Sequence, residues 1–238
     1  MTRKNMFILA LIILLGFTLI ACSNELALNI RYGIQALYYH LIGFEEPLPG
    51  FFALDAARAE FRQAISRNPD DIEPLVLMGM SYRITGDYHT AISYFLSALE
   101  VKPEEEWIYA LIGECYLYLD EVDKASDAYY KAIETEEQAR ALYGLGVISF
   151  NKEGYSETID YMTKALEIAP DLYDARIYLG KSLFFIDDLD KALEELDLAY
   201  RINSQKGEVQ YYLGKIYEQK GESEKAKHFF ERAMELED

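Results

Sequence analysis

The sequence predicts an all-α solenoid, a stack of antiparallel helix pairs. Five glycines recur at nearly equal intervals, at positions 79, 113, 146, 180 and 214. Small residues follow each glycine after 12 and 19 positions, and all are alanine except Thr158. On both sides of a short polar turn, apolar residues recur every three or four positions, as in amphipathic helices. A fixed period of about 34 residues indicates one helix hairpin per repeat, stacked on its neighbours.

The first 21 residues are predicted to form a targeting segment that lies outside the fold. Arg3 and Lys4 supply positive charge, and residues 6–21 carry none. This apolar run is shorter than the roughly 20 residues that a membrane-spanning helix needs. It ends in the tetrapeptide LIAC, whose last residue, Cys22, is one of only two cysteines in the chain. The pattern of a charged start, a short apolar core and a small residue before the end is typical of a signal peptide.

The LIAC tetrapeptide resembles the processing site of bacterial lipoproteins, where the cysteine sulfur carries a diacylglycerol. The resemblance implies that Cys22 is a lipidated mature N-terminus, with acyl chains such as palmitate holding the protein at a membrane of the bacterial cell envelope. Ser23 follows the cysteine in place of aspartate, which favours the outer membrane, facing the periplasm, in a Gram-negative cell. A retained signal-anchor helix is the alternative interpretation.

Residues 22–71 are predicted to hold the lipidated N-terminus and an irregular first helix pair. Ala57 precedes Ala91 by one repeat length, so the segment around it fits the second helix of a repeat. The candidate first helix is residues 25–43, which is displaced from the regular spacing. A terminal repeat is expected to be atypical because it covers the exposed end of the stack.

Each of the five regular repeats is expected to contain two closely packed helices. Glycine inside a helix costs about 1 kcal/mol relative to alanine. Its return in the same place five times therefore implies that a neighbouring helix lies too close for a side chain. Pro103 and Pro170 stand where a proline prevents the second helix from continuing. The predicted repeat boundaries are 72–105, 106–138, 139–172, 173–206 and 207–238.

These series resemble the tetratricopeptide repeat, in which Leu-Gly, an aromatic residue, alanines and a terminal proline recur at intervals of about 34 residues. Arg176, Gln210 and two missing prolines depart from the pattern. The resemblance implies five tetratricopeptide repeats after an irregular N-terminal pair, wound into a right-handed superhelix. It also implies that the first helix of each pair lines a concave groove that binds proteins or peptides.

Twelve residues are predicted to line the partner-binding part of this groove. Wide apolar surface on a soluble protein usually marks an interaction site. In one interpretation the groove accepts a peptide of a partner protein; in the others the helix 25–43 covers it, or its aromatic side chains pack between repeats. The twelve residues are Met80, Arg83, Trp107, Tyr118, Arg140, Tyr143, Phe150, Asn151, Lys181, Phe184, Phe185 and Tyr211.

Composition excludes several other classes of function. The net charge of −18 disfavours nucleic acid as a partner. Two cysteines exclude a disulfide framework, and Cys115 is expected to be a buried, unreactive thiol. The three histidines fall in unrelated parts of the chain, and no catalytic or metal-ligating spacing is found. We therefore predict no enzyme activity, no cofactor and no metal site.

The predicted function is that of a membrane-anchored scaffold lipoprotein that mediates protein–protein interactions in bacterial envelope complex assembly, of the pilus, outer-membrane or murein-machinery type. A competing hypothesis from another class is a groove-type binding protein for a small apolar or aromatic ligand, accessory to solute transport. Self-association through Phe229 or Met234 of the last helix is a further alternative that the sequence leaves open.

Overall fold

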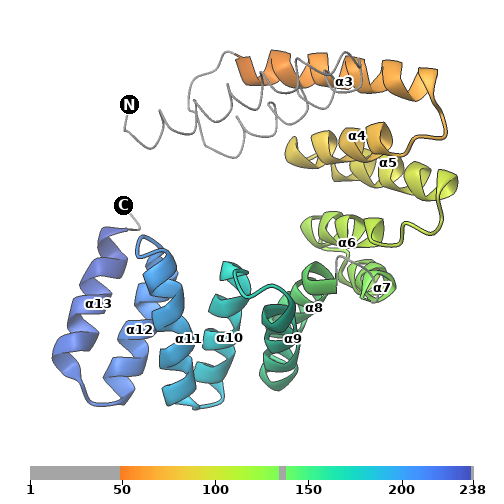
Figure 1. The fold of residues 1–238 in the computed structure, drawn as a ribbon. Coiled ribbons are helices and arrows are strands. Elements are labelled where there is room, and N and C mark those ends of the chain that lie inside the picture. The colour runs from red at the N-terminus through yellow and green to blue at the C-terminus, as the bar shows by residue number, and fades with distance from the viewer. Residues whose placement is uncertain (1–48, 134–137, 237–238) are drawn as a thin grey trace. The chain divides into compact units, whose positions relative to one another are not determined.

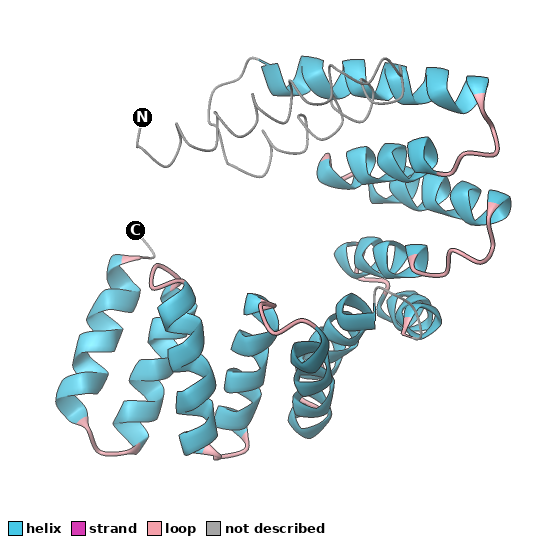
Figure 2. Ribbon diagram, in the orientation of Figure 1, coloured by secondary structure: helices cyan, strands magenta, loops and turns pink. Residues whose placement is uncertain are grey.

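The computed structural model describes residues 49–133 and 138–236, and all of their regular structure is helical (Figures 1 and 2). Eleven helices, α3 to α13, lie in these residues. The predicted all-α solenoid is confirmed. Cys22 and the predicted helix 25–43 lie outside the described residues. The chain divides into an N-terminal unit, residues 1–108, and a C-terminal unit, residues 109–238, and each is described by itself.

The described part of the N-terminal unit contains three helices, α3 (Pro49–Arg67), α4 (Glu73–Ile84) and α5 (Tyr88–Val101). The helices α4 and α5 form a hairpin, and α3 packs on α4. Gly79 of α4 faces the fully buried ring of Phe95 in α5, and a Cβ at this glycine would lie 2.5 Å from Cε1 of Phe95. The recurrent glycine therefore makes room for a large side chain of the second helix.

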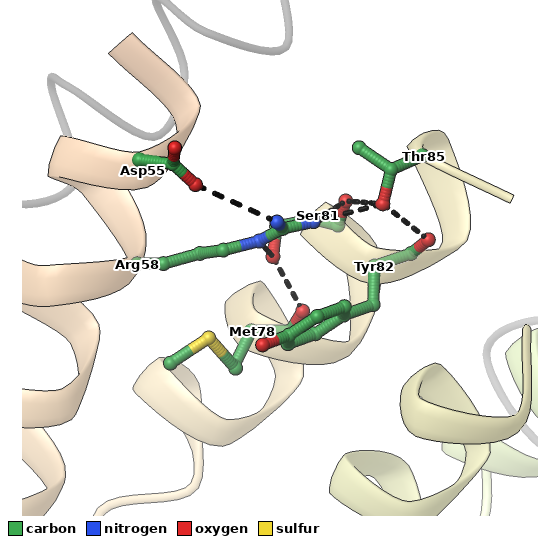
Figure 3. A network of polar contacts seen from close by, with 6 residues as sticks. All are labelled: Asp55, Arg58, Met78, Ser81, Tyr82 and Thr85. Carbon is green, nitrogen blue, oxygen red and sulfur yellow. Dashed lines mark hydrogen bonds and ion pairs between the residues drawn. The ribbon is translucent and has the colours of Figure 1, made fainter. Parts of the chain in front are cut away.

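Arg58 joins α3 to the last turn of α4 (Figure 3). Its Nε donates a hydrogen bond to Oγ of Ser81 at 3.0 Å, and its Nη2 donates to the Ser81 carbonyl at 2.9 Å and to Oγ1 of Thr85 at 2.8 Å. The guanidinium also lies 4.0 Å from the ring centroid of Tyr82. The last carbonyl groups of a helix lack a hydrogen-bond donor within the helix. Arg58 supplies such a donor to the Ser81 carbonyl in the last turn of α4.

The C-terminal unit contains four helix pairs, each of which continues the alternation of first and second helices. Consecutive helices pack against each other from α7 to α13, and α6 meets α7 through the Gly113 contact given below (Figure 1). The first helices also contact one another, α8 with α10 and α10 with α12. The helices are α6 (Ile108–Tyr118), α7 (Val122–Ala132), α8 (Gln138–Asn151), α9 (Tyr155–Ile168), α10 (Tyr173–Phe185), α11 (Leu189–Ile202), α12 (Gly207–Gln219) and α13 (Ser223–Glu235).

Small residues let these helices approach closely. A Cβ at Gly180 of α10 would lie 2.6 Å from Cγ of Leu196 in α11. Gly113 and Gly144 both face the ring of Tyr129, which is almost completely buried. The alanines that follow the glycines in sequence are buried, as is Cys115. The periodic small residues thus form the contact surfaces between helices, and the large side chains fill the space beside them.

The turn inside each repeat contains one residue in the left-handed conformation. Two repeats use glycine, with φ of 78° at Gly86 and 75° at Gly221. In the other three repeats an acidic residue adopts it, with φ of 60° at Asp120, 60° at Glu153 and 66° at Asp187. The tight hairpin thus imposes the left-handed conformation even on residues other than glycine, which adopts it most easily.

Candidate functional site

The twelve predicted groove residues are divided between the two units. Met80 and Arg83 lie on α4, and Trp107 lies just before α6, where its Nε1 donates a hydrogen bond of 2.5 Å to Oε2 of Glu105. These three belong to the N-terminal unit. The remaining nine residues all lie on first helices of the C-terminal unit: Tyr118, Arg140, Tyr143, Phe150, Asn151, Lys181, Phe184, Phe185 and Tyr211.

Aromatic rings from three consecutive repeats meet in the C-terminal unit. Tyr155 stacks on Phe185 with ring centroids 4.6 Å apart and planes 13° apart. Phe150 packs edge to face on Tyr178 at 5.1 Å. Contacts of this kind stabilise a protein by about 0.5–1.5 kcal/mol each beyond the area they bury. We call the whole set the aromatic cluster, and it consists of Tyr143, Phe150, Tyr155, Tyr178, Phe184, Phe185, Tyr211 and Tyr212.

Lys181 of α10 extends into the aromatic cluster. Its Nζ lies 4.6 Å from the ring centroid of Phe150, 5.0 Å from that of Tyr178 and 5.4 Å from that of Tyr212. The same nitrogen donates a hydrogen bond of 2.5 Å to Oε1 of Glu208 in α12. The Lys181 side chain is 10% exposed and that of Glu208 is 41% exposed. The rings and one carboxylate therefore replace much of the water around this cation.

A second ion pair joins neighbouring first helices at the other side of the cluster. Nη1 of Arg140 in α8 lies 2.9 Å from Oε1 of Glu114 in α6. Glu114 and Lys181 each follow the repeat glycine directly, and Arg140 and Glu208 stand at the corresponding place in the next first helix. The two ion pairs thus occupy equivalent positions with the signs of the charges reversed.

The nine residues differ in how much of their surface is exposed. Tyr118 is 67% exposed, and Phe185 and Tyr211 are each 44% exposed. Tyr143, Phe150 and Phe184 are half-buried by contacts within the cluster. Packing between repeats accordingly accounts for part of the predicted set, while Tyr118, Phe185 and Tyr211 keep a large part of their side chains exposed.

Burial also changes the ionisation of the tyrosines in the cluster. It raises the pKa of Tyr143 above the ordinary value, and the neighbouring Tyr178 and Asp174 raise it further. Burial likewise raises the pKa of Tyr178 and of Tyr212, with the carboxylate of Glu208 contributing to both. These hydroxyls are protonated at neutral pH, as those of ordinary tyrosines are, and can donate hydrogen bonds.

Three members of the cluster were not predicted from the sequence. Tyr178 stands three residues before Lys181 and seven before Phe185, a spacing that places all three on one stripe of a helix. This signal was available, and Tyr212 stands at the same place in the following repeat. Tyr155, in contrast, opens a second helix, and only the tertiary structure brings it against Phe185.

The described residues contain no cluster of metal-ligating side chains and no helix suited to span a membrane. No three histidine, cysteine or acidic side chains among them gather closely enough to hold a metal ion. None of the helices α3 to α13 combines the length and the apolar character that crossing a membrane requires. The candidate surface itself is made up of aromatic rings, paired charges and amide or hydroxyl groups.

Comparison with protein families gives matches to the tetratricopeptide repeat over residues 72–105, 108–138, 139–172 and 207–238. Among curated proteins, the chain is 25% identical over 137 residues to the general transcriptional corepressor trfA of Dictyostelium discoideum, a match that covers 56% of this chain and 10% of the relative. The curated relatives are much longer proteins, of which the matched part spans between 10% and 33%.

Two solved structures show how widely the fold is shared. YrrB, described as a tetratricopeptide protein with an unusual peptide-binding site, is 23% identical with a TM-score of 0.60, covering 74% of this chain and 91% of that one. The pilF protein of Pseudomonas aeruginosa is 14% identical with a TM-score of 0.72, covering 84% of this chain and 88% of that one. At these identities the likeness concerns the fold alone.

Proposed function

The chain belongs to the tetratricopeptide repeat family, and from this premise we propose that it is a non-enzymatic scaffold that binds a segment of a partner protein. The observation that carries the proposal is the aromatic cluster of the C-terminal unit, from which Phe185 and Tyr211 remain substantially exposed. The twelve predicted groove residues stay predictions, and the nine on α6, α8, α10 and α12 form the surface on which we base the mechanism.

The arrangement suits a binding surface because its exposed rings are already held in place. Phe185 is fixed by stacking on Tyr155, and Tyr211 lies against Tyr212 and Phe230. When a partner covers these two rings, their side chains lose little further conformational freedom, and this lowers the entropic cost of association. Aromatic residues of this kind dominate the binding energy of protein interfaces.

The partner segment lies across the first helices, either extended or as a short helix. Phe185 and Tyr211 act as apolar anchors, while the exposed amide of Asn151 and the hydroxyls of the neighbouring tyrosines provide hydrogen bonds. The acidic surface of the chain, with a net charge of −18, favours approach by cationic partners over anionic ones.

We further propose that Cys22 carries a lipid that anchors the scaffold to a membrane of the bacterial envelope. The support is the sequence of a charged start, a short apolar run and LIAC. Two or more acyl chains provide stable anchoring, at about 0.8 kcal/mol per buried CH₂ group. In this setting the scaffold serves the assembly of an envelope complex, with the outer membrane and the periplasm as the favoured site in a Gram-negative cell.

Photo-crosslinking in living cells tests the binding surface. A photoreactive amino acid placed at Phe185 or Tyr211 is expected to capture a defined polypeptide. The matched control is Ile202, which is also apolar and exposed but lies at the end of the second helix α11. Capture from Ile202 equal to that from Phe185, or no polypeptide captured from either first-helix position, would contradict the proposal.

The lipid anchor has its own test. The change Cys22→Ser is expected to prevent processing of the precursor and to move the protein from the membrane fraction to the soluble fraction. The corresponding control is Cys115→Ser, since this buried thiol has no part in the anchor. Unchanged processing and membrane partition of the Cys22 variant would refute lipidation.

A further inference from the structure

The ion pairs between first helices follow a rule of position. The residue directly after the repeat glycine pairs with a residue 26 or 27 positions later, in the next first helix. Between α6 and α8 this pair is Glu114 with Arg140, and between α10 and α12 it is Lys181 with Glu208. We call the contact between two consecutive first helices a junction. One charged pair lies at the α6–α8 junction and one at the α10–α12 junction, and the α8–α10 junction lies between these two.

The middle junction breaks the rule. Val147 follows the repeat glycine there, and the position in the next helix is occupied by Asp174. Valine cannot form an ion pair, although α8 and α10 are in contact, as α10 and α12 are. Asp174 is exposed, and it forms no hydrogen bond or ion pair with any residue that the structure describes. The junction thus has the carboxylate of a charged pair without its cation.

Two aromatic rings belong to the same junction. Tyr143 of α8 and Tyr178 of α10 pack edge to face with ring centroids 6.0 Å apart. Asp174 and Tyr178 are four residues apart on α10, so they lie on one face of that helix. The charge of Asp174 is also among the causes that raise the pKa of both tyrosines, after burial. At the next junction the Lys181 ammonium already lies 5.0 Å from the Tyr178 ring centroid. The same surface therefore demonstrates that its rings accept a cation that is paired with a carboxylate.

We propose that a lysine or arginine side chain of the bound partner occupies the middle junction, pairing with Asp174 beside the packed rings of Tyr143 and Tyr178. This inference rests on the proposed function, and it adds that the partner segment is basic at the point where it crosses from α8 to α10. The partner's cation takes the place that a charged residue of the chain fills at the two flanking junctions.

The charges of the surrounding surface agree with a basic segment. The cations nearest in the pattern, Arg140 and Lys181, are each engaged by a glutamate of the neighbouring helix. An acidic segment would have to displace these glutamates and would also meet the exposed carboxylate of Asp174. A basic segment meets no such opposition, and the net charge of −18 draws it towards the chain.

The test uses the full chain and a random dodecapeptide library as the probe. Peptides selected by the wild-type protein are expected to be enriched in lysine or arginine at one position beside an apolar residue. The change Asp174→Asn removes the charge at an exposed site and is expected to weaken binding of the selected peptides by about tenfold, a factor that corresponds to about 1.4 kcal/mol.

A second variant places the missing cation on the chain itself, at position 147. Val147→Lys is expected to form the pair with Asp174 that the flanking junctions have, and so to exclude the partner's cation and remove the basic preference. Val147→Met has similar length without charge, so it leaves the Asp174 carboxylate unpaired, and the peptides that it still binds are expected to keep the basic preference. Circular dichroism of each variant shows that the helices are intact.

The outcomes separate this inference from the proposed function. Selected peptides without basic enrichment, or a basic preference unchanged in both Asp174→Asn and Val147→Lys, would overturn the inference while peptide binding by the scaffold stands. Failure of the wild-type protein to select any peptide would overturn both. If Val147→Lys does not fold, Asp174→Asn alone decides, because its side chain is exposed.

Discussion

Lys181 and Glu208 join two repeats through one short ion pair, and the cation is the more deeply buried partner. The rings of Phe150, Tyr178 and Tyr212 lie around the Lys181 ammonium, whereas the Glu208 carboxylate keeps contact with water. The two members of the pair are therefore unequal. Loss of the carboxylate leaves a charge that water cannot fully reach, and loss of the cation leaves one that it can.

This inequality predicts the order of two variants. Glu208→Gln is expected to lower the free energy of unfolding by about 1–2 kcal/mol, because Lys181 then lies among the rings without a counter-ion. Lys181→Met is expected to cost less, since methionine fills similar space and makes favourable contacts with rings. Urea unfolding followed by circular dichroism measures both, and a larger loss for Lys181→Met would contradict this account of the cluster.

Arg58 is expected to be irreplaceable by lysine at the junction of α3 and α4. Arg58→Lys keeps the charge but loses the planar fork that reaches Ser81 and Thr85 together, and a cost of about 1–2 kcal/mol is expected. Hydrogen exchange of the α3 amides should rise in the same variant. Asp55→Asn serves as the control, because this exposed carboxylate lies 3.8 Å from Arg58 and contributes less than about 0.5 kcal/mol.

The close approach at Gly180 predicts a penalty for alanine in spite of its higher helix propensity. A Cβ there would meet the buried side chain of Leu196, and the expected net loss of stability is about 1–3 kcal/mol. The combination of Gly180→Ala with Leu196→Ala should cost clearly less than the sum of the two single changes, because the second removes the clash. Additive costs in thermal or urea unfolding would show that the two residues do not compete for space.

Stability is expected to fall in alkaline solution. Burial raises the pKa of Tyr129 and of Tyr143 in the folded protein above the value of about 10 that tyrosine has in an unfolded chain. Above pH 10 the unfolded chain therefore loses protons that the folded protein retains, so unfolding becomes more favourable by about 1.4 kcal/mol per pH unit for each such tyrosine. Below pH 10 this contribution is constant.

Unfolding in urea at pH 8 to 11 measures that fall. Tyr129→Phe removes one of the two titrating groups and is expected to make the decline shallower, while Tyr211→Phe, at an exposed position, is expected to change it less. The prediction is wrong if the decline begins below pH 9 or if the two variants have equal slopes.

Much of the fold could be predicted from local patterns. The glycines at 79 and 180 and the alanines that follow them indicated close helix contacts, and both glycines do face buried side chains of the following helix. The turn residues were less predictable. In the repeat that contains Gly154, the preceding Glu153 is the residue that adopts positive φ, because the geometry of the hairpin and not the residue type selects the position.

The candidate surface was predictable in part. Tyr118, Phe185 and Tyr211 were selected from their places on first helices, and they are exposed. Lys181 was selected as a groove residue by the same reasoning, but its burial between rings and its pairing with Glu208 could not be foreseen. Trp107 was also selected as a residue of a first helix, but α6 begins at Ile108, so Trp107 lies in the preceding loop.

Local sequence patterns are sufficient to predict helix pairs of one repeating kind, because helix periodicity and small residues at close contacts involve residues that are near one another in the chain. Which side chains of different repeats meet depends instead on how the helices pack. Lys181 and Glu208 are 27 residues apart, and the position equivalent to Lys181 one repeat earlier is Val147, so that Asp174 has no ion-pair partner among the described residues. Such contacts between repeats depend on how the helices pack together, and they cannot be predicted from the pattern within one helix.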